Sequence, residues 1–272
     1  YLTGVGPNDK FDPARVEAIA AGSGAALPAG GKAEVFRSVD GHSAEATTER
    51  TDQLTATGAT RTDASSHTDT VVADGTVTKT VATESTSATV NGSGVTVKAA
   101  ESTATTETVR DQEFGRSSSS GTSTSSATSV NVGSGGVNVS DSQSVGTTST
   151  DGFGKTTSQT DTTTNSGQLL LGDQVGVAGS RTDSTKNVEG IFTDTTSVQT
   201  RGSITDDGVA LGQTRTLDSE TDMGNGTART SSIGASADGS FNWSVEPAAG
   251  GQYVVTTTVN ISGGVQGSGG QK

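Results

Sequence analysis

The chain has 272 residues, of which 28% are hydrophobic and 3% aromatic, and its formal net charge at pH 7 is −13. It contains no cysteine, which excludes disulfide bonds and thiolate metal sites. The acidic balance argues against a nucleic-acid partner, and no stretch approaches the roughly 20 apolar residues of a membrane helix. Ser, Thr and Val dominate the sequence, which favours an all-β fold with a thin core.

The first 40 residues differ from the rest and are predicted to be an arm with one short helix. Asp12 is a candidate N-cap, Pro13 suits the first helical position, and Gly22 suits the C-terminal end. The chain begins at Tyr1 without a methionine. We interpret this start as the result of removing a secretory signal, and expect a secreted, extracellular or cell-surface protein.

Residues 41–232 form a Ser/Thr/Gly-rich region with a predicted repeat of roughly 38 residues. Each unit holds two glycine turns, and each turn lies close to an apolar residue. The first series is Val77, Phe114, Phe153 and Phe192, at intervals of 37, 39 and 39 residues. The second series is Val95, Val137, Val175 and Val209, at intervals of 42, 38 and 34 residues. We expect these eight side chains to occupy the core of the repeat.

Within a unit the sequence alternates as a strand does, yet neither face is strongly apolar. In residues 75–90, one face carries Val77, Lys79 and Val81, and the other is mostly Thr and Ala. Small side chains of this kind can stack between coils, so the preferred prediction is a β-solenoid-like stack. The alternative is a meander of long hairpins or a sandwich.

Residues 233–272 are predicted to be a C-terminal cap or docking strand with a Gly-rich tail. Phe241 lies beside Trp243, the only tryptophan of the chain. The strongest strand pattern follows, and its alternation puts one set of apolar side chains on a single face. The expected self-assembly residues are Tyr253, Val255, Val259 and Ile261.

No pattern of catalytic residues is present, and we expect no enzyme activity, no cofactor and no metal site. The two histidines, His42 and His67, have no nucleophile motif around them. Acidic residues beside glycines, as in the turn at residues 73–76, are expected from turn chemistry alone and match no calcium loop.

The texture of residues 40–262 resembles, at the level of class, the secreted Ser/Thr/Gly-rich repeat proteins of bacterial surface fibres, matrix filaments and adhesins. This resemblance implies a structural subunit of an extracellular filament, whose partner is another copy joined through a terminal segment. The alternatives are an adhesin stalk or tip that binds a carbohydrate or a surface, and a viral fibre segment.

Overall fold

The computed structural model describes residues 32–39, 41–110, 115–171, 175–224, 226–248 and 252–271. Every regular element in these ranges is a β-strand, and there are thirteen of them. Their bounds are β1 Lys32–Val39, β2 His42–Thr55, β3 Gly58–Ala73, β4 Thr76–Asn91, β5 Gly94–Arg110, β6 Ser117–Gly133, β7 Gly136–Thr150, β8 Thr156–Leu170, β9 Gly176–Glu189, β10 Phe192–Thr205, β11 Gly208–Gly224, β12 Thr227–Ala248 and β13 Gln252–Gln271.

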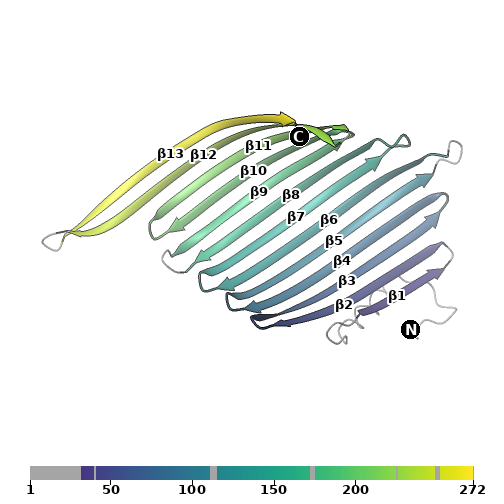
Figure 1. Ribbon diagram of the computed structural model, residues 1–272, viewed down its shortest axis with the longest axis horizontal. Coiled ribbons are helices and arrows are strands. Elements are labelled where there is room, and N and C mark those ends of the chain that lie inside the picture. The colour runs from purple at the N-terminus through teal and green to yellow at the C-terminus, as the bar shows by residue number, and fades with distance from the viewer. Residues whose placement is uncertain are drawn as a thin grey trace. The chain divides into compact units, whose positions relative to one another are not determined.

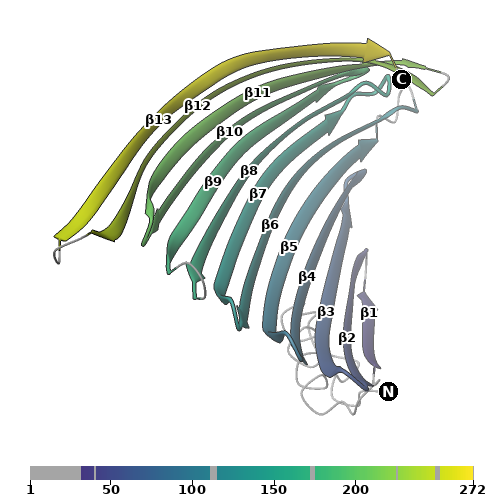
Figure 2. The same ribbon diagram turned by 60° about the vertical axis from the view of Figure 1, so that its left-hand side comes forward.

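The chain divides into two compact units. The described residues up to Ser129 and Gln143–Ser158 belong to the first unit, and Val130–Ser142 with the residues from Gln159 onward belong to the second. Within each unit the strands lie side by side in chain order as one layer (Figures 1 and 2). The pairings are antiparallel from β1 to β5 and again from β9 to β13.

The predicted all-β class is therefore confirmed, and the hairpin meander named as the alternative describes the strand pairing. The solenoid is not what the structure shows. Consecutive strands are joined by short turns and pair antiparallel, so their hydrogen bonds satisfy hairpin neighbours instead of stacked coils. The predicted N-terminal helix lies outside the described residues.

Glycines at the starts of several strands allow neighbouring backbones to approach closely. Gly58 begins β3 opposite Asn91, and a Cβ atom there would lie 2.3 Å from the carbonyl oxygen of Val90. Gly208 begins β11, where a Cβ atom would lie 2.4 Å from the carbonyl oxygen of Phe241. The glycine turns seen in the sequence are thus the places where one strand ends and the next begins.

The described residues of the two units form no hydrophobic core of ordinary size. Among the described residues, the buried hydrophobic side chains are Ala44 and Ala46, both on β2, and no charged or polar side chain is buried. The accessible surface of the chain is 17405 Å². A compact protein of 26.9 kDa exposes roughly 11,000 Å². A single layer of strands leaves both faces of the sheet open, and this contributes to the excess.

The valines of the second series correspond closely to equivalent strand positions. Val95, Val137 and Val209 are each the second residue of their strand, directly after a glycine. Val175 comes one residue before the glycine that begins β9, so it is out of step with the other three. Three of the four valines in this series therefore occupy the same position in their strands.

The first series does not occupy equivalent positions and does not form a core. Phe153 lies in the turn between β7 and β8 with 81% of its surface exposed, and Phe192 begins β10 with 54% exposed. Val77 is also exposed, and Phe114 lies outside the described residues. The expectation that these residues share an interior is wrong for the isolated chain, because a one-layer sheet encloses no interior.

The Phe153 ring instead contacts a cation. The guanidinium carbon of Arg116 lies 4.2 Å from the ring centroid, which is the geometry of a cation–π contact. The Asp151 carboxylate accepts hydrogen bonds from the backbone amides of Phe153 and Lys155, each at 2.9 Å. This aromatic side chain therefore belongs to an Asp-stabilised turn and not to a repeat core.

Candidate assembly surfaces

Strand β13 is an open edge of the second unit. It pairs with β12 along its length, and no other described strand pairs with it. All of its residues are exposed, and Gln252–Gln271 contains no charged side chain. A long uncharged edge offers unpaired backbone N–H and C=O groups to another strand, which proteins usually prevent with charges or proline.

The predicted self-assembly residues all lie on β13, on one face of it. Tyr253, Val255, Val259 and Ile261 are separated by even numbers of residues, so their side chains point to the same side. All four are exposed, Ile261 at 86%. The structure therefore leaves these side chains accessible on an edge strand.

The hairpin of β12 and β13 extends beyond the neighbouring strand β11. Pairing between β11 and β12 stops at Gly208 and Asn242, where the Trp243 amide donates to the Asp207 carbonyl at 2.8 Å. Residues 243–248 and 252–257 then pair only with each other. We call these two segments the ribbon. The Trp243 ring lies at its base, with its centroid 5.9 Å from that of Phe241.

The strand register of the second unit produces an apolar face that the sequence analysis missed. Directly paired residues on β9, β10, β11, β12 and β13 form one apolar row across five strands: Val177, Ile204, Val209, Phe241 and Val259. Cross-strand partners point to the same side of a sheet, so this row lies on one face. The signal is present in the sequence but becomes readable only when the five strands are aligned.

Leu211 and Ile261 lie on the same face as the row, two residues further along β11 and β13. We call the row together with these two residues the apolar patch. Gly239 lies between them as the direct partner of both, and Gly202 pairs with Leu211 on its other side. Every residue of the patch except Val209 is an exposed large hydrophobic.

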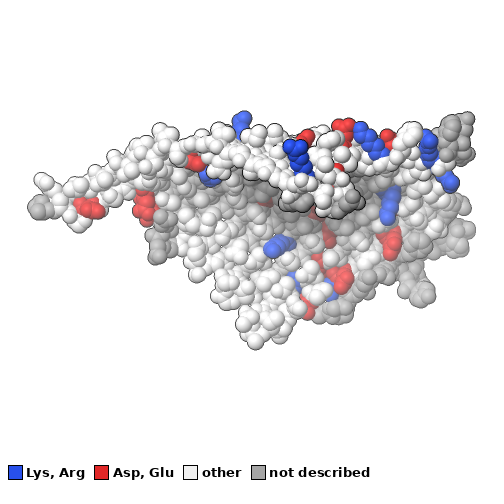
Figure 3. Space-filling model, turned by 45° about the horizontal axis from the view of Figure 1, so that its top comes forward, with Lys and Arg blue, Asp and Glu red and all other residues white. Residues whose placement is uncertain are grey.

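Residues next to the patch on the same strands point to the opposite face, and they are small or polar. Ser203, Ala210, Ser240 and Asn260 form the adjacent paired row. Figure 3 shows that lysine, arginine and acidic side chains are scattered over the face in view and that uncharged residues cover most of it. At the patch the sheet of the second unit is therefore amphipathic, with apolar side chains on one face and small or polar side chains on the other, whereas Arg181 and Asp183 lie further along the same face of β9 as Val177.

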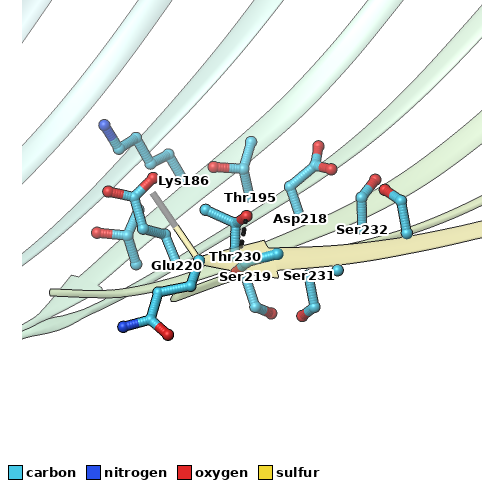
Figure 4. Close-up of a pocket in the computed structure, with 13 residues that line it drawn as sticks. Lys186, Thr195, Asp218, Ser219, Glu220, Thr230, Ser231 and Ser232 are labelled. Carbon is cyan, nitrogen blue, oxygen red and sulfur yellow. Dashed lines mark hydrogen bonds between the residues drawn. The ribbon is translucent and has the colours of Figure 1, made fainter. Parts of the chain in front are cut away.

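A polar hollow of about 580 Å³ lies elsewhere in the second unit, on strands β9 to β13. Asp218 and Glu220 from β11 line it with Lys186 from β9 and Thr195 from β10, as the close-up shows (Figure 4). The Thr230 hydroxyl donates to the Gly270 carbonyl across its floor at 3.5 Å. The hollow offers hydroxyl and carboxylate groups to solvent and contains no histidine.

The described part of the chain contains no group of three or more His, Asp or Glu residues that would hold a metal ion. The same part contains no helix long and apolar enough to cross a membrane.

In the first unit, charged pairs bridge β2 and β3. Arg50 Nε lies 2.6 Å from Asp63 Oδ1, and Arg61 Nε lies 2.8 Å from Asp52 Oδ1. The hydrogen bond from Arg61 lowers the pKa of the Asp52 carboxyl below its ordinary value. Each pair has one member on β2 and one on β3, and all four side chains lie on one face of the sheet. This face of the first unit is therefore charged at these positions, in contrast to the apolar patch of the second unit.

The two histidines also lie in the first unit, on β2 and β3. His42 Nε2 lies 2.8 Å from Asp69 Oδ1, whereas the buried Nδ1 atom of His67 has no hydrogen-bond partner. His67 is paired in register with Ala46 and Ala82 and not with a hydroxyl side chain. The residues directly paired with it therefore supply no nucleophile for catalysis.

Comparison of the chain with models of protein families, with curated proteins and with solved structures finds no match.

Proposed function

We propose that this protein is a structural subunit of an extracellular filament or surface fibre, and that subunits join through strand β13. The observation that carries the proposal is the uncharged and fully exposed edge at Gln252–Gln271. Adding a strand from another copy would satisfy the free backbone groups of that edge, and the alternate side chains would give specificity.

The near absence of a core gives a second physical motive for assembly. A protein that buries so little apolar surface gains stability when a neighbouring subunit covers what remains exposed. The four side chains Tyr253, Val255, Val259 and Ile261 are the anchors of this joint, because they are large, apolar and exposed on the edge strand.

Negative-stain electron microscopy of three proteins tests the proposal. The full-length chain should form fibres, and a chain that lacks residues 252–272 should not. Because this deletion also removes the partner of β12, a second variant replaces the four anchors by serine. Since those side chains are exposed, the serine variant should keep the far-ultraviolet circular dichroism of the full-length protein and still fail to form fibres.

A chain that lacks residues 1–11 is the matched control, and it should assemble like the full-length protein. Wild-type fibres from both the deletion of 252–272 and the serine variant would contradict the joint. A full-length protein that stays monodisperse and monomeric at high concentration would contradict the filament.

An adhesin tip that binds carbohydrate is the second candidate, and the exposed aromatic side chains near the ribbon favour it. Tyr253 is exposed, and the Trp243 ring lies beside that of Phe241 on the same face, tilted by 47°. Aromatic faces of this kind provide apolar contact with a polar edge. Retention on an immobilised polysaccharide, abolished by Tyr253→Ser, would favour this function over the structural one.

A further inference from the structure

The apolar patch and the adjoining ribbon form a continuous group of aligned apolar side chains in the second unit. The patch spans five strands of the second unit, and its members are paired directly from β9 to β13. Exposed apolar patches of more than a few hundred Å² on a protein mark interaction sites. We propose that this face packs against the same face of a second copy of the chain.

The apolar patch carries no charged side chain, and this favours an apolar partner. Between Val177 and Gly179 on β9, Gly202 and Ile204 on β10, and Val209 and Leu211 on β11, the side chains of this face carry no charge. The same holds for the paired residues of β12 and for the whole of β13. A charged ligand would lose its hydration here without gaining a partner, whereas a second apolar face loses nothing of this kind.

The area agrees with a two-fold contact. Five strands about 4.8 Å apart, each contributing three residues with a rise of about 3.4 Å, give a flat area of roughly 250 Å². The ribbon adds roughly 200 Å² on the same estimate. Stable interfaces bury about 600 to 1,000 Å² per partner, and a corrugated surface exposes more than its flat area. The flat area of the patch and the ribbon is roughly 450 Å². Side chains that project from it, such as Leu211 at 66% and Ile261 at 86% exposed, bring the accessible area toward the lower end of that range.

The shape of the patch is complementary to the same patch on a second copy. Leu211 and Ile261 project on either side of Gly239 and are 66% and 86% exposed. A Cβ atom at Gly239 would meet only the Asn260 carbonyl oxygen, at 4.0 Å, so the space above this glycine is open. In a two-fold dimer a projecting side chain of one copy can enter the open space above Gly239 of the other copy. The reverse contact follows by symmetry.

This interface shares Val259 and Ile261 with the proposed joint on β13, but it differs from strand addition in the groups that it buries. Face packing buries side chains of the interior strands β9 to β12, which strand addition at the edge leaves exposed. The dimer can therefore form without filaments, and its failure would leave the proposed function untouched.

Sedimentation equilibrium of the full chain, after removal of any fibres, tests the proposal with two neighbouring substitutions on β11. Leu211→Lys places a charge in the patch, and Ala210→Lys places the same charge on the opposite face of the same strand. Leu211 is on an interior strand, so neither variant alters the edge. The wild type and Ala210→Lys should dimerise alike, whereas Leu211→Lys should raise the dissociation constant about 30-fold or more.

A third variant and a spectroscopic signal make the test sharper. Gly239→Leu fills the open space above this glycine, where an added Cβ atom meets only the Asn260 carbonyl oxygen at 4.0 Å, and should weaken the dimer, whereas Gly234→Leu on the opposite face should not. Trp243 lies next to the patch, so its fluorescence emission should shift to shorter wavelength as the wild type dimerises.

Three results would overturn the proposal. In the first, the wild type is monomeric at all concentrations. In the second, Leu211→Lys and Ala210→Lys have the same dissociation constant as the wild type. In the third, a monomeric wild type co-sediments with neutral phosphatidylcholine vesicles, which would assign the patch to a lipid surface instead.

Discussion

Strands β2 to β5 of the first unit and β9 to β13 of the second follow the same hairpin plan but bring different side chains into register. In the first unit, Arg50 faces Asp63 and Arg61 faces Asp52 across neighbouring strands. In the second, Ile204 is paired with Val177 on one side and with Val209 on the other. One plan therefore yields rows of charged pairs in the first unit and an apolar row across five strands in the second.

The difference shows that a one-layer sheet takes its properties from the side chains that the register aligns. A charged face can remain exposed to water, because its charges stay hydrated. An exposed ion pair contributes only about 0 to 1 kcal/mol to stability, so little is lost if water separates the pair. Leaving apolar surface exposed to water is unfavourable by a free energy of about 25 cal/mol per Å². The second unit is therefore the part of the molecule from which we expect association.

The largest expected effect on stability comes from burial. In this protein a small buried side chain should contribute more to stability than a large exposed one. Ala46→Asp places a carboxylate where 2% of the residue is exposed, and should destabilise the fold by about 3 kcal/mol or more. Leu211→Asp in the second unit should change the stability by less than about 0.5 kcal/mol, because this side chain is already in solvent.

Urea denaturation followed by circular dichroism, at a concentration where the protein is monomeric, measures both free energies of unfolding. A loss at Leu211→Asp as large as that at Ala46→Asp would mean that the apolar face of the second unit is covered within the single chain.

A smaller effect is expected at the strand-starting glycines, and there the two units should respond alike. Gly58→Ala in the first unit and Gly208→Ala in the second both push a methyl group into a backbone carbonyl. Each should cost about 1–3 kcal/mol, because a backbone cannot move aside as a flexible side chain can.

The matched control is Gly234→Ala, where the nearest atom is Thr216 Cγ2 at 3.6 Å, an ordinary contact. It should be neutral or slightly stabilising in the same denaturation experiment. If Gly58→Ala and Gly208→Ala also prove neutral, the close approach at the turns is not part of what holds the hairpins together.

The smallest expected effect concerns pH, and each unit contains one pair that reports it. The hydrogen bond from Arg61 lowers the pKa of Asp52, and hydrogen bonds from Arg181 and then Thr163 lower the pKa of Asp183. A lowered folded-state pKa stabilises the fold above the ordinary pKa of an aspartate, about 3.9, and this contribution is lost as the pH falls through the folded value.

Carboxyl carbon chemical shifts recorded by NMR between about pH 6 and pH 2 would give both values. Arg61→Gln should return the Asp52 pKa to its ordinary range and leave Asp183 unchanged, and Arg181→Gln should do the reverse. Identical titrations of Asp52 in the wild type and in Arg61→Gln would show that the pair does not form in solution.

The all-β class, the positions of most turns and the C-terminal strand follow from the amino-acid sequence alone. These features are local: β-branched residues favour extended backbone, glycines mark the places where strands begin, and alternation shows which residues of one strand share a face. For the same reason the alternation within residues 252–262 is sufficient to place Tyr253, Val255, Val259 and Ile261 together on one side of β13.

The choice between stacked coils and hairpins depends on how the strands pair, because Ser/Thr-rich strands satisfy their hydrogen bonds equally well in either arrangement. The pairing also leaves Phe153 and Phe192 exposed, although their regular spacing predicts a shared interior. The apolar row from Val177 to Val259 is a tertiary feature for a related reason. Each strand contributes one or two of its residues, and a shift of the register by a single residue would send that strand's contribution to the opposite face.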